Sequence, residues 1–245
     1  MTAAVMVIAH RGASSYAPEN TLAAFDLALE MRVRHIELDV ALTSDSHIVV
    51  IHDDKLDRTT DACGLVTSHT LAALRELDAG SWFAAQFQGE RIPTFDEVLG
   101  RYNGRVHIHT EIKGKSPSLS QRTADLIRKH GMERQVTVTS FQSVRLEEMR
   151  AYAPELPRGW LVREINDFTI AQAHTIGVTQ LCPRADTVTP ELVHRLHAEG
   201  FVARAWGVST EALMQQSVEA GVDGMTVNFP DKLIAYLEAH NYSWV

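Results

Sequence analysis

The stretch of sequence that decides the fold is residues 5–40, which read VMVIAHRGASSYAPENTLAAFDLALEMRVRHIELDV. Its first five residues form a short apolar run rich in Val and Ile, as expected of a buried strand. After a polar loop, apolar side chains recur at helical spacing from Leu22 to Leu29. Residues 35–40 then read as a second strand. The stretch therefore predicts one strand–helix–strand unit of a parallel α/β protein.

The same unit recurs along the rest of the chain. Further strands are expected at 106–112, 136–141, 158–162, 179–182, 201–206 and 224–228. Helices are expected at roughly 94–102, 118–130, 143–152, 167–176, 190–199, 210–220 and 231–239. Eight such units without a long linker predict a single TIM (β/α)8 barrel over residues 1–245, with a doubly wound sheet as the alternative fold.

Two segments depart from this pattern. Residues 54–93 form an irregular, turn-rich insertion, for which Trp82, Phe83 and Phe87 are the expected anchors. In residues 42–52 a polar turn joins two β-prone runs too closely for a helical crossover, which needs about a dozen residues. This segment therefore predicts an antiparallel hairpin. A turn centred between Asp45 and Ser46 would place His52 opposite Asp39.

Composition limits the classes of function. The 245 residues carry a net charge of −8, which argues against a nucleic-acid partner. No apolar run reaches membrane-spanning length, so membrane insertion is not expected. Cys63 and Cys182 have no metal-binding or redox spacing and suit a reducing compartment. The first residues lack a basic signal region, which favours a cytoplasmic location; the oligomeric state is not encoded in any recognisable pattern.

Acidic side chains gather where two predicted strands end. Glu37 and Asp39 are two residues apart and so point the same way, and Glu111 and Lys113 repeat this spacing. Barrel active sites lie at the C-terminal rim of the strands. Three carboxylates in one barrel mouth would repel one another unless a cation neutralised them, and oxygen ligands favour Mg²⁺ or Ca²⁺ over zinc. The alternative is a set of ordinary surface ion pairs.

Two histidines are expected to lie beside these acids and are candidates for proton transfer. His10 ends the first strand and His52 ends the hairpin, and an unperturbed imidazole titrates near neutral pH. Arg11 and Lys113 can bind phosphate oxygens, which suits the cleavage of a phosphodiester. The alternative is a solvated or structural role, because the chain has 12 histidines.

Five motifs occur in order along the chain. They are His10-Arg-Gly12, Pro18-Glu-Asn-Thr21, Glu37-Leu-Asp39, His52-Asp53 with Leu56-Asp-Arg-Thr-Thr60, and Glu111-Ile-Lys113. Together they resemble the glycerophosphodiester phosphodiesterase family of the cytosolic bacterial type, over essentially the whole length. The segments Ser140-Phe141 and Val227-Asn-Phe-Pro230 also fit the family pattern.

The resemblance implies a TIM barrel with a small insertion after the hairpin. It implies one divalent cation held by Glu37, Asp39 and Glu111, with Mg²⁺ favoured over Ca²⁺. His10 and His52 would be acid and base, and Arg11 and Lys113 would bind the phosphate of a small-molecule substrate. The products would be glycerol 3-phosphate and an alcohol such as choline, ethanolamine or glycerol. Trp206 is interpreted as an apolar wall for the glycerol carbons, with a plain core role as the alternative.

Some questions stay open at the level of sequence. The residues after Trp206 are Gly207-Val-Ser209, and Val227 stands where the family usually has Thr, so substrate preference is in doubt. The nucleophile is either water or the glycerol 2-hydroxyl, and neither histidine is assigned as acid or base. A related lyase acting on a phosphosphingolipid or phosphoinositide, and a non-catalytic module that binds glycerophosphodiesters, are the alternative functions.

Overall fold

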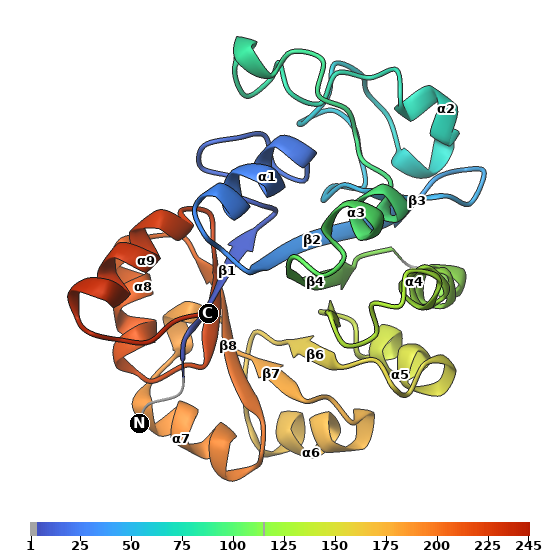
Figure 1. Ribbon diagram of the computed structural model, residues 1–245. Helices are drawn as coiled ribbons and strands as arrows, with labels where there is room; N and C mark the ends of the chain where they lie inside the picture. Colours follow the sequence, from blue (N-terminus) through green and yellow to red (C-terminus); the bar gives the residue numbers. More distant parts are fainter. Residues whose placement is uncertain (1–3, 115) are drawn as a thin grey trace.

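The computed structural model describes residues 4–114 and 116–245, so residues 1–3 and 115 of the expected domain lie outside it. Eight parallel strands form a closed barrel, because the first strand, β1, pairs with both β2 and β9. Helices surround this barrel (Figure 1). The predicted TIM barrel is confirmed, and the doubly wound alternative is wrong, since its sheet would stay open at both edges.

The strands are short and match the predicted positions closely. The barrel strands are β1 (Met6–His10), β2 (His35–Leu42), β4 (His107–Ile112), β5 (Val136–Ser140), β6 (Arg158–Leu161), β7 (Gln180–Cys182), β8 (Val202–Val208) and β9 (Gly224–Val227). The outer helices are α1 (Leu22–Glu30), α3 (Phe95–Tyr102), α4 (Pro117–Lys129), α5 (Ser143–Tyr152), α6 (Asp167–Ile176), α7 (Pro190–Ala198), α8 (Glu211–Glu219) and α9 (Pro230–Ala239). A short 3-10 helix, η3 (Ala185–Thr187), precedes α7.

Local sequence explains where the helices begin and end. Thr21 caps α1 by accepting a hydrogen bond from the backbone N–H of Ala24, and Thr94 forms a reciprocal capping box with Glu97 at the start of α3. Gly177 ends α6 in the left-handed conformation, with φ of 72°. These caps satisfy backbone groups that a helix end leaves unpaired.

The strands are buried on both faces, but the two faces differ in chemistry. On β2, Ile36 and Leu38 are fully buried in the apolar core that the helices cover. Glu37 and Asp39 alternate with them and are also buried, with 3% and 0% exposure. Because successive side chains of a strand point to opposite faces, both acids point into the barrel interior. The fold therefore places polar side chains on the inside of the barrel, where the candidate site lies.

The hairpin exists, but its predicted register is wrong by one residue. Strand β3 (Ile48–Val50) pairs with β2 so that Val40 lies opposite Val50, which places Asp39 opposite Ile51 rather than His52. The turn has three residues instead of two, and Ser46 at its end is left-handed, with φ of 67°. Three-residue hairpin loops commonly end in such a residue. The sequence did not reveal this, because Ser is not a typical left-handed residue.

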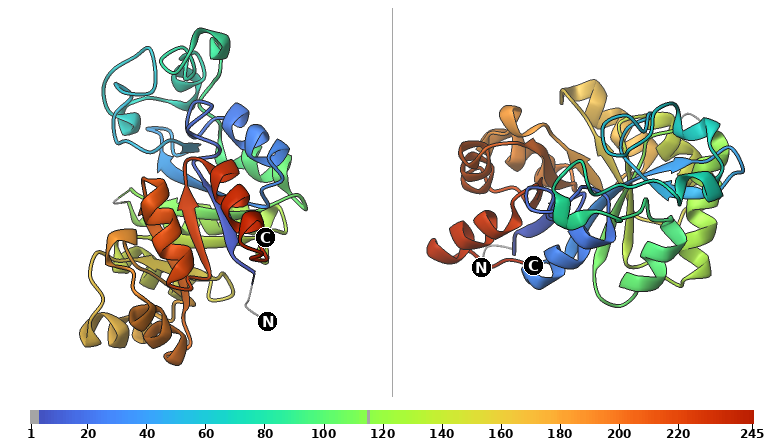
Figure 2. Two further views of the ribbon diagram at one scale, coloured as in Figure 1. Left: turned by 90° about the vertical axis from the view of Figure 1, so that its left-hand side faces the viewer. Right: turned by 90° about the horizontal axis from the view of Figure 1, so that it is seen from above.

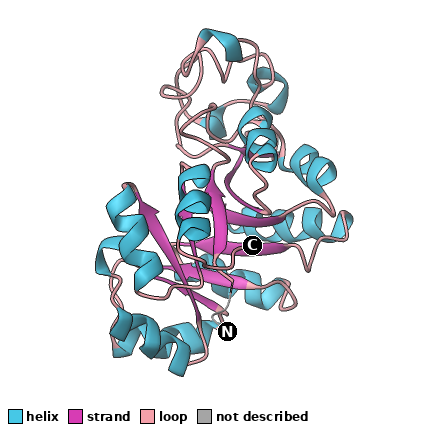
Figure 3. Cartoon of the chain, turned by 60° about the vertical axis from the view of Figure 1, so that its left-hand side comes forward, coloured by secondary structure: helices cyan, strands magenta, loops and turns pink. Residues whose placement is uncertain are grey.

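The insertion between β3 and α3 is a compact, loop-rich lobe at one end of the barrel (Figures 1, 2 and 3). It contains η1 (Val66–Ser68), α2 (Leu71–Leu74) and η2 (Ala85–Phe87). Its small core consists of Val49, Ile51, Leu56, Val66, Leu74, Ala79 and Ile92. The expectation that Trp82, Phe83 and Phe87 anchor it is wrong: they contact one another edge to face, and Trp82 is 39% exposed. Aliphatic side chains continuing from β3 fill the core instead.

The two ends of the described chain meet at the barrel. The backbone N–H of Val5 donates to the carbonyl of Ser243, and that of Val7 donates to the carbonyl of Val245. Within residues 4–114 and 116–245, every helix is too short or too polar to cross a lipid bilayer.

Candidate active site

Three acids predicted from two strands come together in the barrel mouth. Glu37 and Asp39 lie on β2 and Glu111 lies on β4, where Asp39 and Glu111 are register partners. One carboxylate oxygen from each lies within 4.8 Å of the others. All three residues are buried, and Asp39 Oδ1 has no hydrogen-bond partner among the described residues. Buried carboxylates this close are costly unless protons or a cation neutralise them.

The pKa values record this crowding. Burial, followed by the charges of Asp39 and Glu111, raises the pKa of Glu37 well above its usual value. Burial and Asp39 raise the pKa of Glu111 to about 7. Burial would also raise the pKa of Asp39, but Arg11 and Lys113 outweigh it and hold that pKa below its usual value. The cluster therefore keeps one firmly ionised carboxylate and two that retain protons easily.

The two predicted histidines flank the acids from different elements. His10 ends β1, with its Nδ1 2.6 Å from Asn228 Oδ1 and its Nε2 3.9 Å from Glu37. His52 follows β3, and its Nδ1 lies 2.5 Å from Asp53 Oδ1. Both Nδ1 atoms face an acceptor, and neither Nε2 has a hydrogen-bond partner among the described residues, so the Nε2 atoms are available to a substrate. Burial lowers the pKa of His10 to about 4 and also lowers the pKa of His52.

The predicted phosphate-binding residues lie between the acids. Arg11 Nε is 3.3 Å from Asp39 Oδ2, and Lys113 Nζ is 3.2 Å from Glu111 Oε1. Arg11 has a left-handed backbone, with φ of 57°, and its N–H donates to Glu37 Oε2 at 3.1 Å. The next residue, Gly12, packs so closely that an added Cβ would lie 2.6 Å from the Ala24 backbone. This tight turn after β1 fixes the orientation of Arg11.

A chain of ion pairs joins the two histidine loops. Arg11 Nη1 contacts Glu19 Oε1 at 2.8 Å, and Glu19 in turn contacts Arg58 Nη1 at 2.6 Å. Arg58 Nε then donates to Asp53 Oδ2 at 2.7 Å, and Asp53 holds His52. The hydrogen bond from Arg58 holds the pKa of Asp53 well below its usual range. The Leu56–Thr60 motif thus has a physical role: its arginine ties the insertion to the first loop.

The site opens into a cavity of about 230 Å³, which we call the rim pocket. Its lining comprises His10, Arg11, Glu37, His52, Glu111, Lys113, Phe141, Leu161, Arg204, Trp206, Gly207 and Thr226. The predicted Trp206 lies on its wall, 4.7 Å from Phe141 in an edge-to-face contact, and its Nε1 donates to the Val162 carbonyl. All eight residues predicted from the sequence therefore lie at one end of the barrel.

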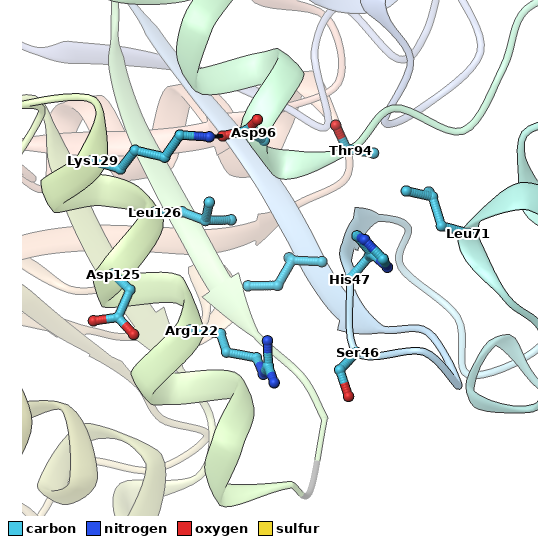
Figure 4. Close-up of a pocket in the computed structure, with 10 residues that line it drawn as sticks. Ser46, His47, Leu71, Thr94, Asp96, Arg122, Asp125, Leu126 and Lys129 are labelled. Carbon is cyan, nitrogen blue, oxygen red and sulfur yellow. Dashed lines mark hydrogen bonds and ion pairs between the residues drawn. The ribbon is translucent and has the colours of Figure 1, made fainter.

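A larger groove of about 390 Å³ lies on the outside of the barrel, between the hairpin, α3 and α4 (Figure 4). Its charged groups are largely engaged in ion pairs, such as Lys129 with Asp96 at 2.7 Å. No carboxylate cluster lines it within the described residues. The rim pocket is therefore the better candidate for chemistry.

Several site residues were not predicted as such. Asn20 Nδ2 donates to Asp39 Oδ2 at 2.9 Å, a contact that the sequence did not predict. Arg204 is 1% exposed, and none of its three side-chain nitrogens has a hydrogen-bond partner among the described residues. Its position two residues before Trp206 was the available signal, because such a spacing on a strand shares one face. Asn228 lies 218 residues from its partner His10, and no local pattern pairs the two.

The unusual residue after Trp206 has a local structural reason. Gly207 is left-handed, with φ of 73°, and the pairing of β8 with β9 shifts register between Ala205 and Val208. A glycine tolerates this conformation at a bulge, whereas a β-branched residue would be strained. This bulge lies at the wall of the rim pocket, which Trp206 and Gly207 line.

Comparisons with known proteins agree with this geometry. Residues 10–232 match the model of the glycerophosphoryl diester phosphodiesterase family. A glycerophosphodiester phosphodiesterase of Caldanaerobacter subterraneus subsp. tengcongensis is 37% identical, over 94% of this chain and 96% of the relative. The solved structure of an Oleispira antarctica phosphodiesterase, in complex with the product sn-glycerol 3-phosphate, superposes with a TM-score of 0.89 at 30% identity and covers 97% of both chains. An Agrobacterium tumefaciens glycerophosphodiester phosphodiesterase gives a TM-score of 0.83 at 30% identity, over 96% of this chain and 100% of the other.

Proposed function

Since the chain belongs to the glycerophosphoryl diester phosphodiesterase family, we propose that its rim pocket hydrolyses glycerophosphodiesters to sn-glycerol 3-phosphate and an alcohol. The observation that supports the mechanism is the convergence of Glu37, Asp39 and Glu111 between two histidines whose Nε2 atoms make no hydrogen bond within the part of the chain that the structure describes. The alternative of a non-catalytic binding module has no use for two such histidines. The chain is therefore a phosphoric diester hydrolase.

The acid cluster fits a single divalent cation. Its donors are all carboxylate oxygens, its members are too close to ionise together unaided, and Asp39 Oδ1 lacks a hydrogen-bond partner among the described residues. When bound, such a cation would polarise a phosphoryl oxygen and acidify the nucleophile. We favour Mg²⁺ over Ca²⁺, in keeping with a cytoplasmic enzyme. The unpaired thiols of Cys63, which is exposed, and Cys182, which is buried, support that compartment.

The partners of the histidines suggest different roles. His52 faces the carboxylate of Asp53, which stabilises an imidazolium, whereas His10 faces a neutral amide. We therefore assign His52 as the acid that protonates the leaving alkoxide, and His10 as the base that activates the nucleophile. Arg11 and Lys113 would orient the phosphate, and Trp206 would contact the glycerol carbons. Residues 1–245 would act as a single catalytic domain, and residues 54–93 would be an insertion within it. This insertion supplies Arg58, which donates a hydrogen bond to Asp53.

The assignment can be tested with two leaving groups. His52→Ala is expected to slow release of choline from glycerophosphocholine by about 10²–10⁴-fold, because the alkoxide then leaves unprotonated. Its effect on the p-nitrophenyl ester of glycerol phosphate is expected to be far smaller, since p-nitrophenolate needs no proton to leave. His10→Ala is expected to slow the hydrolysis of both substrates. For each variant and substrate, kcat is measured at a saturating concentration of the metal ion.

The control is His194→Gln, an exposed histidine on α7 outside the rim pocket, which should leave both rates unchanged. Equal losses on both substrates in His52→Ala would overturn its role as acid. Unchanged turnover in His10→Ala would overturn the catalytic assignment of His10.

A further inference from the structure

The rim pocket is lined by a buried arginine that the proposed mechanism does not use. Arg204 of β8 is only 1% exposed, and none of its three side-chain nitrogens is hydrogen-bonded within the part of the chain that the structure describes. Its register partner on β9 is Gly224, which has no side chain to accept a hydrogen bond. A guanidinium offers five N–H donors and is costly to bury without acceptors. The donors of Arg204 are therefore available to a ligand of the pocket.

The carboxylate that attracts Arg204 is engaged with other groups. The charge of Arg204 acts on Glu37, but no hydrogen bond joins these two described side chains. Glu37 Oε2 accepts from the backbone N–H of Arg11 at 3.1 Å, and the same carboxylate belongs to the cluster that would hold the cation. An ion pair within the protein therefore does not explain the position of Arg204.

Arg204 lies deeper in the barrel than Trp206. The two residues are two apart on β8, so their side chains share the interior face, and both line the rim pocket. The active site of such a barrel opens at the C-terminal ends of the strands, so the earlier residue on a strand is the deeper one. A substrate group that extends past Trp206 into the barrel therefore meets Arg204.

The substrate would reach Arg204 with its glycerol end. In the closed ring of eight strands, β8 lies four strands from β4 and so forms the opposite wall. Strand β4 supplies Glu111 and Lys113, and the neighbouring strands β2 and β1 supply the other groups proposed for the cation and the phosphate. A glycerol that lies against Trp206 extends away from these groups toward β8.

We propose that Arg204 binds the terminal hydroxyl of the glycerol, the one farthest from the phosphate, and selects substrates that have this hydroxyl. This inference rests on the proposed function, because it places the glycerol against Trp206. The hydroxyl oxygen accepts from the guanidinium. Its proton can go to Thr226, which also lines the pocket and whose own hydroxyl donates to the Ala205 carbonyl at 3.5 Å.

A buried charged donor distinguishes strongly between ligands with and without an acceptor. An analogue that lacks the terminal hydroxyl covers Arg204 but leaves its donors unpaired. A hydrogen bond to a charged group typically changes affinity by about 10–100-fold. We expect discrimination of this size, because the loss falls on a group that is already shielded from water.

The test compares glycerophosphocholine with propane-1,2-diol phosphocholine, in which hydrogen replaces the terminal hydroxyl. Both substrates keep the 2-hydroxyl, so either proposed nucleophile remains available. Choline release gives kcat/KM for each substrate, and the ratio of the two values measures recognition of the terminal hydroxyl. We expect a ratio of about 10–100 in the unaltered protein, and Arg204→Met should lower it about tenfold or more.

A variant and a binding measurement serve as controls. Arg158→Met removes a buried arginine of β6 that lies outside the lining of the rim pocket, and it should leave the ratio unchanged. Calorimetric titration of the unaltered protein with sn-glycerol 3-phosphate and with propane-1,2-diol 1-phosphate gives the same comparison as a ratio of Kd values. This measurement depends neither on the folding of a variant nor on catalysis.

The outcomes separate this inference from the proposed function. Equal affinity for the two phosphomonoesters, or a kcat/KM ratio that Arg204→Met leaves unchanged, would overturn the role of Arg204. Equal losses on both substrates in Arg204→Met would place Arg204 on the phosphate and so overturn its assignment to the hydroxyl. Tighter binding of sn-glycerol 3-phosphate without any turnover of glycerophosphocholine would overturn the proposed function and still support recognition of the hydroxyl.

Discussion

Two buried arginines in the barrel differ in how their charge is satisfied. Arg158 donates to the carbonyls of Leu156 and Gly177 at 2.6 and 3.0 Å. Arg204 is buried at least as deeply but has no hydrogen-bond partner among the described residues. Taking a charge out of water costs several kcal/mol, and replacing Arg204 with an apolar side chain removes that cost but also its attraction to Glu37. In the metal-free protein Glu37 retains its proton easily, so little of that attraction is lost, and we expect Arg204→Met to raise the free energy of unfolding by about 1–4 kcal/mol.

Arg158→Met is the matched comparison and should have the opposite sign. It leaves buried carbonyls without donors, which costs about 1–3 kcal/mol. Denaturant unfolding of the metal-free proteins measures both changes in the free energy of unfolding. Destabilisation by both substitutions would mean that solvent satisfies Arg204 within the barrel.

The spacing of residues along the strands explains which site residues could be predicted from the sequence. Glu37 and Asp39 follow from alternation along one strand, and His10 and Arg11 follow from the end of another. Asn228 and Arg58 could not be found in this way, because each acts on a partner from a distant loop or strand. Only the closed barrel brings β9 beside β1 and so places Asn228 against His10.

Three histidine rings pack together inside the barrel, where strand β2 contacts strand β4. The rings of His35, His107 and His109 have centroids 5.0–5.5 Å apart, and His35 Nδ1 lies 3.2 Å from His109 Nε2. Burial lowers the pKa of His35 and of His107 to about 4, and lowers that of His109 well below its usual value. The native barrel therefore holds all three rings neutral.

This cluster predicts acid sensitivity of the fold. Below pH 6.5 the unfolded chain binds protons that the native barrel does not, so stability falls as the pH falls, and the loss continues toward pH 4. Each fully buried histidine contributes up to about 1.4 kcal/mol per pH unit, and less where it is partly exposed. Denaturant unfolding between neutral and mildly acidic pH measures the slope. His109→Gln should reduce it, whereas a slope unchanged from that of the exposed control His194→Gln would contradict the prediction.

The elements themselves were predictable to within about two residues because each carries its own periodicity and cap. The hairpin register was not, because one left-handed residue, Ser46, changes the loop length without a sequence signature. His52 still reaches the rim pocket despite the shifted register. It lies beyond the last paired residue of β3, so the loop that carries Asp53 and Arg58 positions it.

At the scale of the whole molecule, the chain has two cores of unequal size. The barrel core and the insertion core meet at β3, because Ile48 and Val50 belong to the larger cluster, whereas Val49 and Ile51 belong to the smaller one. The barrel was predictable because eight repeated units specify it. The insertion core was not, because its aliphatic residues are scattered among turns, and the more conspicuous aromatic residues lie at its surface.

Because the barrel and the insertion have separate cores, we expect the insertion to unfold locally while the barrel stays folded. Leu74→Ala, in the insertion core, is expected to destabilise that region by about 2–5 kcal/mol and to raise hydrogen exchange across residues 54–93. Strands β5 to β8 should keep their protection. Leu181→Ala, in the barrel core on β7, is the control and should raise exchange throughout the barrel. If the two substitutions raised hydrogen exchange equally in the insertion and in the barrel, the two regions would unfold together, which would contradict the prediction.

The most direct test of the whole account is calorimetric titration of the metal-stripped protein with Mg²⁺. We expect about one ion per chain, bound through the three carboxylates of the barrel mouth. Asp39→Asn should abolish binding and turnover of glycerophosphocholine together, whereas Asp125→Asn, in the outer groove, should change neither. Full turnover without any divalent ion, or unaltered binding in Asp39→Asn, would contradict the account.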